Sequence, residues 1–231
     1  MNEEKIPFRG FDERGEVRVY YHGVLPHWRQ ENCTYFVTYR LADALPVGVI
    51  REFEYERDQW LLHRGIDPKP LSAEGFDWKN TVGQLPKNDQ RLYERTMATK
   101  LNKYLDAGHG SCVLKRPDLA EIVANSLTHF HGDRVLTGNF VVMPNHVHVL
   151  MRPINGFELE DILQAVKSFT ANAINRKLGV EGPFWMRESY DHIVRDPEQL
   201  EAFQNYIRAN PEKAKLTSHE YILQDATYRL E

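Results

Sequence analysis

Hydrophobic and polar positions along the chain repeat with two different periods, and each period predicts one type of secondary structure. Runs rich in aromatic and β-branched residues predict strands at 33–41, 133–153 and 182–195, and the middle run divides into two strands near Met143-Pro144-Asn145. Apolar residues spaced three or four apart predict helices, which fall at 49–65, 89–110, 116–132, 156–179 and 196–210. Strands and helices therefore alternate along one chain.

The last two helices have the clearest signals. The helix at 156–179 carries an apolar stripe made of Leu159, Ile162, Leu163, Val166, Phe169 and Ala173. The helix at 196–210 opens with Asp196 as its N-cap and Pro197 in its first turn. We expect it to end near Asn210, because Pro211 disfavours helical geometry at the residue before it.

The order strand, helix, strand, strand, helix, strand, helix predicts an α+β fold. We expect a ferredoxin-like antiparallel sheet with helices, plus a helical insertion after the first strand and a C-terminal helix that carries candidate catalytic residues. The 231 residues suit a single domain. We expect an N-terminal extension at 1–30 and a mostly helical insertion at 46–111. The core would consist of 33–45 and 112–212, followed by a C-terminal tail at 213–231.

Composition narrows the class of protein. The net charge is −4, which argues against a protein that coats duplex DNA without sequence preference, although 29 Lys and Arg residues allow a local basic groove. Cys33 and Cys112 are far apart, so neither a disulfide framework nor a cysteine zinc motif is present. The N-terminus has no apolar signal segment, and no run approaches the roughly 18 apolar residues of a membrane span. We expect a soluble, cytoplasmic protein.

The segment VVMPNHVHVLMRP, residues 141–153, places His146 and His148 one residue apart in an apolar run. Side chains alternate between the faces of a strand, so both imidazoles point to one face while Val147 and Val149 anchor the other. Two neutral imidazoles on one face form half of a metal site. The alternative is that both histidines lie on a solvated face of the sheet.

A metal site needs further ligands, and the last helix offers them. Tyr206 and Asn210 stand four residues apart and share one helix face. The amide oxygen of Asn210 is a hard ligand, so a site with two histidines suits Mg²⁺ or Mn²⁺, and Tyr206 would reach a substrate held there. Two structural explanations stay open: Asn is common at helix C-termini, and Tyr206 would also suit a core position beside Phe203 and Ile207.

Several motifs, in one order, resemble those of the REP-associated tyrosine transposases, which belong to the single-tyrosine HUH (IS200-like) superfamily of single-stranded DNA transposases. The motifs are VVMPNHVHVLMRP, ILQAVKSFTANAINRKLG, FWMRESYDHIVRD and YIRANPEKA, preceded by YFVTYRLADALP, LDAGHGSCVL and IVANSLTHFHGDR. The resemblance covers roughly residues 27–215. The least familiar stretches are 1–25, parts of 46–95 and the end after 215.

This resemblance implies a role for each candidate residue. In that family a His-hydrophobic-His motif supplies two metal ligands, which fall here on His146 and His148. The family's Tyr-Ile-x-x-Asn type of motif matches YIRAN, which implies Tyr206 as the nucleophile and Asn210 as the third ligand. The motif ESYDHIV contains a rival tyrosine, Tyr190, which we interpret as part of a strand whose neighbours line the site.

The implied reaction is cleavage of a phosphodiester bond by transesterification, with a 5′-phosphotyrosine and a released 3′-hydroxyl. The implied cofactor is Mg²⁺ or Mn²⁺. The implied partner is single-stranded or hairpin DNA of the REP-like palindromic kind, bound by a monomer or a homodimer, with no membrane. Basic residues would follow its phosphates while unpaired bases stack on aromatic groups. The candidates are Lys167, Arg176, Lys177, Arg187 and Arg195, each of which would otherwise be an ordinary solvated charge.

Two other functions stay open. The segment HVHVL is similar to the alternating histidines of the histidine-triad nucleotide hydrolases, but Leu150 occupies the third position, where that chemistry needs a nucleophile. A domesticated protein that holds a DNA or RNA hairpin without cutting it would keep the same residues. Formation of a covalent protein–DNA adduct distinguishes the three functions.

Overall fold

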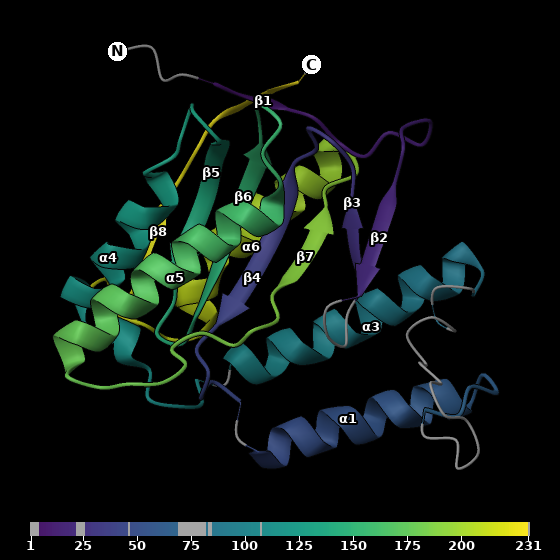
Figure 1. The fold of residues 1–231 in the computed structure, drawn as a ribbon, viewed down its shortest axis with the longest axis horizontal. Helices are drawn as coiled ribbons and strands as arrows, with labels where there is room; N and C mark the ends of the chain where they lie inside the picture. Colours follow the sequence, from purple (N-terminus) through teal and green to yellow (C-terminus); the bar gives the residue numbers. More distant parts are fainter. Residues whose placement is uncertain are drawn as a thin grey trace.

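The fold is built on one antiparallel sheet of five strands in the order β7-β4-β6-β5-β8 (Figure 1). The structure, a computed structural model, describes residues 5–21, 26–45, 47–68, 82, 85–106 and 108–230. The strands of the sheet are β4 (Tyr35–Arg40), β5 (Val135–Val142), β6 (His146–Pro153), β7 (Tyr190–Ile193) and β8 (Ile222–Gln224). Without β8, the first and third strands of the core lie in the centre, as in a ferredoxin-like fold. The predicted fold class is therefore confirmed.

Helices cover both faces of this sheet (Figure 1). On one face lie α4 (Pro117–Thr128), preceded by the single turn η1 (Val113–Lys115), and α5 (Leu159–Leu178); on the other lies α6 (Pro197–Lys213). Because side chains alternate along a strand, Val147 and Val149 of β6 pack with the α4 and α5 side chains, whereas Leu150 packs with those of α6. The two histidines of β6 are in phase with Leu150 and therefore face α6.

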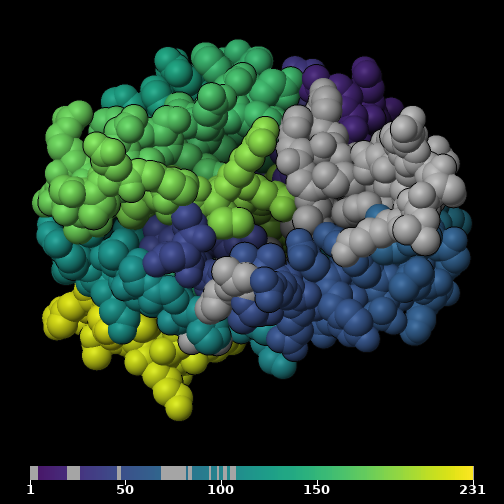
Figure 2. All heavy atoms as spheres, turned by 60° about the horizontal axis from the view of Figure 1, so that its bottom comes forward, coloured from purple at the N-terminus to yellow at the C-terminus, as the bar shows by residue number. Residues whose placement is uncertain are grey.

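The insertion after β4 consists of α1 (Val47–Leu62) and α3 (Lys87–Asp106), which run side by side below the sheet in Figure 1. Both helices were expected. They enclose a small core of their own, made of Leu61, Ile66, Val82, Tyr93 and Met97. In the space-filling view, α1 forms the outer surface of the molecule in blue (Figure 2). The loop expected at 66–89 lies largely outside the described residues, and none of the described helices is long and apolar enough to cross a membrane.

Short strands at both ends of the chain were not expected. β1 (Ile6–Phe8) pairs in parallel with β9 (Tyr228–Leu230), and β2 (Arg18–Tyr21) forms a hairpin with β3 (Pro26–Arg29). The polar composition of residues 1–30 concealed these strands, because β3 is held by buried charges instead of an apolar face. Its His27 and Arg29 both contact Asp191 of β7.

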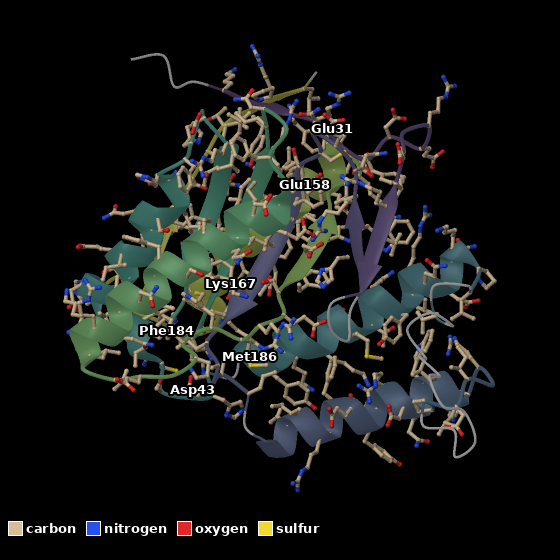
Figure 3. All side chains as sticks on the ribbon, viewed as in Figure 1. Glu31, Asp43, Glu158, Lys167, Phe184 and Met186 are labelled. Carbon is tan, nitrogen blue, oxygen red and sulfur yellow. The ribbon has the colours of Figure 1, made fainter. Side chains whose placement is uncertain are left out.

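The strand expected at 182–195 is shorter than predicted. Only Tyr190–Ile193 pairs with β4 as a ladder, and an isolated bridge joins Leu41 to Trp185 before it. The physical reason is Lys167 of α5, which lies beside Met186 in Figure 3. Its Nζ donates hydrogen bonds to the carbonyl oxygens of Met186 and Arg187, at 2.7 and 2.9 Å, which directs these carbonyls toward α5.

The last core helix is longer than predicted. We expected it to end near Asn210, but α6 continues to Lys213 with Pro211 inside it. Pro211 lacks the N–H that would donate to Ile207, yet its side chain is buried and only two further residues of the helix follow. The preference of a residue before proline for extended geometry is thus outweighed here by packing, and Asn210 lies within the helix instead of at its end.

Candidate metal and tyrosine site

His146 and His148 lie on β6, the central strand of the sheet, whose eight residues are all buried. Their side chains face α6, and the two residues are 1% and 0% exposed. Their Nε2 atoms are 3.0 Å apart. The interpretation of the pair as solvated side chains is therefore wrong, and two imidazole nitrogens converge in the protein interior.

Each imidazole is held by an oxygen on its other nitrogen. Nδ1 of His148 lies 2.7 Å from Oγ1 of Thr38 on β4, and Nδ1 of His146 lies 2.7 Å from Oδ1 of Asn145. The amide nitrogen of Asn145 donates to the carbonyl oxygen of His109 at 2.9 Å, which fixes the orientation of the amide and directs its oxygen to His146. Such partners orient the rings and favour Nε2 as the free metal-binding nitrogen. No sequence motif pointed to Thr38, because its role depends on the register between β4 and β6.

Burial keeps both rings neutral. It lowers the pKa of His146 to about 3, with a further contribution from the nearby Arg40 guanidinium. Burial and the neighbouring His146 lower the pKa of His148 well below its ordinary value. A neutral imidazole is the form that binds metals, so both residues are ligand-competent at neutral pH.

Helix α6 places Tyr206 against this pair and carries Asn210 one turn further along. The ring of Tyr206 meets the ring of His148 edge-on, with the ring centroids 5.0 Å apart. Asn210 is 1% exposed, and within the described part of the chain neither Oδ1 nor Nδ2 has a hydrogen-bond partner. An unpaired buried amide costs about 1–3 kcal/mol, so a fold that keeps one points to a ligand for it.

These residues fit a divalent metal ion. Two ligands at right angles and about 2.1 Å from one octahedral ion stand roughly 3.0 Å apart, and the two Nε2 atoms have this separation. Among the described residues, no three His, Cys, Asp or Glu side chains gather as a metal site. A third protein ligand would have to be of another type, such as an amide oxygen, and nitrogen with hard oxygen ligands suits Mg²⁺ or Mn²⁺.

A pocket of about 480 Å³ opens beside Tyr206, bordered by β4, β7, α3 and α6. Its aromatic lining consists of Phe36, Tyr190, Phe203 and Tyr206, together with His192. The rings of Phe36 and Phe203 are stacked with centroids 4.2 Å apart. Burial and the charge of Arg195 lower the pKa of His192 to about 4, so this ring is neutral too. The pocket therefore combines neutral rings with the guanidinium groups of its other walls, and Tyr206 links it to His148.

The rival tyrosine, Tyr190, is the first residue of β7 and does lie in a strand. It pairs with Thr38, so it points to the same face of the sheet as His148 and borders the same pocket as Tyr206. Its ring meets Phe36 at a centroid distance of 6.5 Å, whereas Tyr206 contacts the ring of His148 itself. Both tyrosines border the pocket, and of the two it is Tyr206 whose ring contacts His148.

The five candidate DNA-binding residues do not form one surface. Lys167 and Arg187 line a second pocket of about 480 Å³ on the α5 side of the sheet, whereas Arg195 borders the Tyr206 pocket. Lys177 forms an ion pair with Asp118 at 2.7 Å, and Arg176 is exposed on α5. The Lys167 ammonium already has three acceptors, and burial together with Arg40 lowers its pKa to about 8.

A buried ion network behind β7 also went unseen in the sequence. Asp191 accepts from His27 and from Arg29, and Arg29 also pairs with Glu160 at 2.6 Å. Burial alone would raise the pKa of Asp191, but the hydrogen bond from His27 and the charge of Arg29 lower it. Asp191 lies between Tyr190 and His192, so β7 separates this network from the Tyr206 pocket.

The family model described as transposase IS200 like matches residues 116–210. Residues 116–210 therefore match an IS200-like transposase domain. The matched residues contain both β6 histidines, Tyr206 and Asn210. The IS200-like character that the motifs indicated is therefore confirmed for these residues. Leu150, which stands where a histidine triad needs its third histidine, is buried and apolar.

Two solved structures are similar to this chain. One is a REP-associated tyrosine transposase bound to a REP hairpin, with 14% identity, a TM-score of 0.42, and coverage of 87% of this chain and 75% of that one. The other is a candidate transposase from Deinococcus radiodurans R1, with 13% identity, a TM-score of 0.27, and coverage of 87% and 97%. Curated proteins give no match.

Proposed function

We propose that this protein is a single-stranded DNA endonuclease and strand transferase that acts on hairpin DNA through a covalent tyrosine intermediate. The observation that carries the proposal is the contact of Tyr206 with His148, whose Nε2 stands 3.0 Å from that of His146. Asn210, one turn further along α6, adds a buried amide with no partner among the described residues. The contact between Tyr206 and His148, together with the buried Asn210 one helical turn away, supports a site made of one nucleophile and three metal ligands within residues 116–210.

His146, His148 and Asn210 would hold a divalent metal ion, and transposases of this family generally use one. When bound, such an ion supplies positive charge that stabilises the charge building on a phosphodiester in the transition state. The protein's own contribution is orientation. Thr38 and Asn145 fix the two rings, and the buried strand keeps water away from them.

Tyr206 is the group that forms the new bond. Its phenolic oxygen attacks phosphorus as the bond from phosphorus to the 3′-oxygen breaks, so a 5′-phosphotyrosine and a 3′-hydroxyl result. The phenol loses a proton and the leaving oxygen gains one, which balances the step. A phenol with an ordinary pKa of about 10 is a better leaving group than an alkyl alcohol, so another 3′-hydroxyl can reverse the reaction. Because the covalent link keeps the bond energy, rejoining requires no nucleotide cofactor.

An unpaired strand is the substrate that suits the pocket. The half-buried rings of Tyr190 and Phe203 border it, and unpaired bases bind to such faces without regard to sequence. The palindromic, REP-like class of hairpin is the substrate implied by the motifs. Such a hairpin presents unpaired flanks next to a short duplex.

The test is direct. The protein is incubated with Mn²⁺ and a labelled hairpin oligonucleotide with unpaired flanks, taken from palindromic repeats beside its own gene, and the products are run on a denaturing gel. We expect a labelled band at the mass of the protein that is absent for Tyr206→Phe. Tight binding with no adduct would show a non-catalytic hairpin-binding protein instead.

A further inference from the structure

The insertion helix α3 brings two arginines to the pocket of Tyr206. Arg91 and Arg95 are four residues apart on α3, so they share one face of this helix, and both border the pocket. Arg195, from the end of β7, borders it as well. A helix that precedes the matched residues 116–210 therefore contributes to the wall around the candidate nucleophile.

These two arginines have no anionic partner in the described part of the chain: neither forms an ion pair or a side-chain hydrogen bond there. Lys100, on the same helix, differs, because its Nζ pairs with Glu56 of α1 at 2.6 Å. The charge on Lys100 is thus neutralised inside the insertion, while the charges on Arg91 and Arg95 remain open to a ligand at the pocket. In a protein of net charge −4, two such cations beside one pocket favour an anionic ligand.

We propose that Arg91 and Arg95 bind phosphates of the single strand next to the phosphate that Tyr206 attacks, which makes α3 part of the DNA-binding site. This inference rests on the proposed function and extends it to the insertion. Guanidinium groups match phosphate oxygens with two parallel hydrogen bonds, and one helical turn between them allows each to take a separate phosphate. The aromatic rings across the pocket hold the bases while the arginines hold the backbone.

Arg91 and Arg95 are positioning residues in this scheme, because they act on phosphates that do not react. Their removal therefore weakens binding of the strand and lowers the rate at limiting substrate, and leaves the saturated rate nearly unchanged. A purely structural role would instead change the melting temperature, and the salt dependence of binding would stay the same.

The experiment measures binding of a fluorescent hairpin with unpaired flanks by anisotropy, at several salt concentrations, in a Tyr206→Phe background that prevents cleavage. Arg91→Gln/Arg95→Gln removes the two charges. Arg51→Gln/Lys103→Gln removes two exposed charges from the same insertion, on α1 and α3, away from the pocket. Arg91→Lys/Arg95→Lys tests whether charge is sufficient.

We expect the first variant to reduce the slope of log affinity against log salt by about 1.4, because each single-strand phosphate that the protein no longer neutralises lowers the slope by ~0.7. The matched variant should keep the wild-type slope, and the lysine variant should restore it. Replacing flank phosphates by neutral methylphosphonates should lower the affinity of the wild-type protein at the positions that the arginines bind. The same replacement should leave the affinity of Arg91→Gln/Arg95→Gln unchanged. If Arg91→Gln/Arg95→Gln has the same salt slope as the matched variant Arg51→Gln/Lys103→Gln, the inference is overturned.

The inference and the proposed function fail in different ways. A wild-type protein that forms the covalent adduct while Arg91→Gln/Arg95→Gln keeps the full salt slope refutes only the role of α3. A folded wild-type protein that binds no hairpin refutes both. Binding with the expected slope but without any adduct supports the role of α3 and refutes the endonuclease.

Discussion

Thr38 of β4 lies directly opposite His148 of β6, and its hydroxyl oxygen is 2.7 Å from Nδ1 of that histidine. A proton on Nδ1 that is donated to Thr38 leaves Nε2 with its lone pair. With the protons of both rings on Nδ1, the two Nε2 atoms, 3.0 Å apart, face each other with lone pairs. Two facing lone pairs repel, so a cation between them removes the conflict.

Thr38→Val should therefore weaken metal binding while it preserves the shape of the core. We expect Mn²⁺ affinity to fall by about 10–100-fold, the usual effect of removing a partner that orients a ligand. Titration of Mn²⁺ followed by electron paramagnetic resonance measures it without any need for cleavage. Thr38→Ser keeps the hydroxyl and serves as the control. Equal affinities for Val and Ser would show that the hydroxyl has no part in holding the ring.

His146→Ala and His148→Ala should each lower adduct formation by more than ~100-fold, because each removes a ligand rather than its partner. The measurement is the rate of adduct formation with saturating Mn²⁺, alongside a thermal melt to confirm folding. His129→Ala, at an exposed histidine near the end of α4, is the control and should cleave normally. Wild-type rates in either single variant with added metal would mean that the metal site is assigned wrongly.

Tyr206→Phe should bind the hairpin about as tightly as wild type and form no covalent adduct, since only the hydroxyl is removed and the ring stays against His148. Tyr190→Phe should still form the adduct. Mass spectrometry of the nucleotide-bearing peptide gives an independent assignment. A modified peptide from 188–195 in place of 201–210 would identify Tyr190 as the nucleophile.

Hairpins with unpaired flanks should be bound and cut, and a fully paired duplex of the same sequence should not. Tyr190, Phe203 and Tyr206 contribute rings to the lining of the Tyr206 pocket, and rings bind bases only when these leave the stack. Competition of both DNAs against a labelled hairpin, followed by the adduct assay, measures the difference. Comparable cleavage of the perfect duplex would contradict this prediction.

Asp191→Asn should destabilise the protein by about 3–5 kcal/mol at neutral pH, because it leaves Arg29 and His27 buried without their counter-charge. The pKa of Asp191 is lowered in the fold, so its contribution is present above pH ~4 and is lost as the pH falls through the folded value. Burial opposes the effect of Asp191 on His27, but the pKa of His27 is raised on balance, so its contribution is present below pH ~6.5 and is lost as the pH rises.

The difference in the free energy of unfolding between wild type and Asp191→Asn should therefore be largest between pH ~4 and ~6.5. Urea denaturation across this range measures it. Asp118→Asn, which removes an exposed carboxylate paired with Lys177 and Arg116, is the control and should cause a smaller change. A difference that does not vary with pH would show that the network is not ionised as described.

Local geometry explains what the sequence could predict. The alternation of a strand places His146 and His148 on one face, and one helical turn places Tyr206 and Asn210 on another, whatever the rest of the fold does. The ferredoxin-like order followed from the same two periods. Each of these predictions depends on residues that are at most a few positions apart.

What the sequence could not predict depends on contacts between distant segments. His27 and Asp191 are 164 positions apart, and Thr38 and His148 are 110 apart, so no local pattern marks either pair. The placement of Arg91 and Arg95 beside Tyr206 is of the same kind, because it depends on how the insertion packs. The end of α6 was predicted wrongly because a local preference before Pro211 was outweighed by burial.

The short strand β8 also protects one edge of the sheet from self-association. It pairs with β5 at Phe140, Val141 and Val142, and so forms the edge of the sheet opposite the β7 edge. β5 has the sequence VLTGNFVV, with no charged residue and no proline. If the chain were cut before residue 219, this strand would present unpaired backbone groups to other molecules, and such edges promote self-association. By pairing with β5, the C-terminal tail thus keeps this edge from pairing with other molecules.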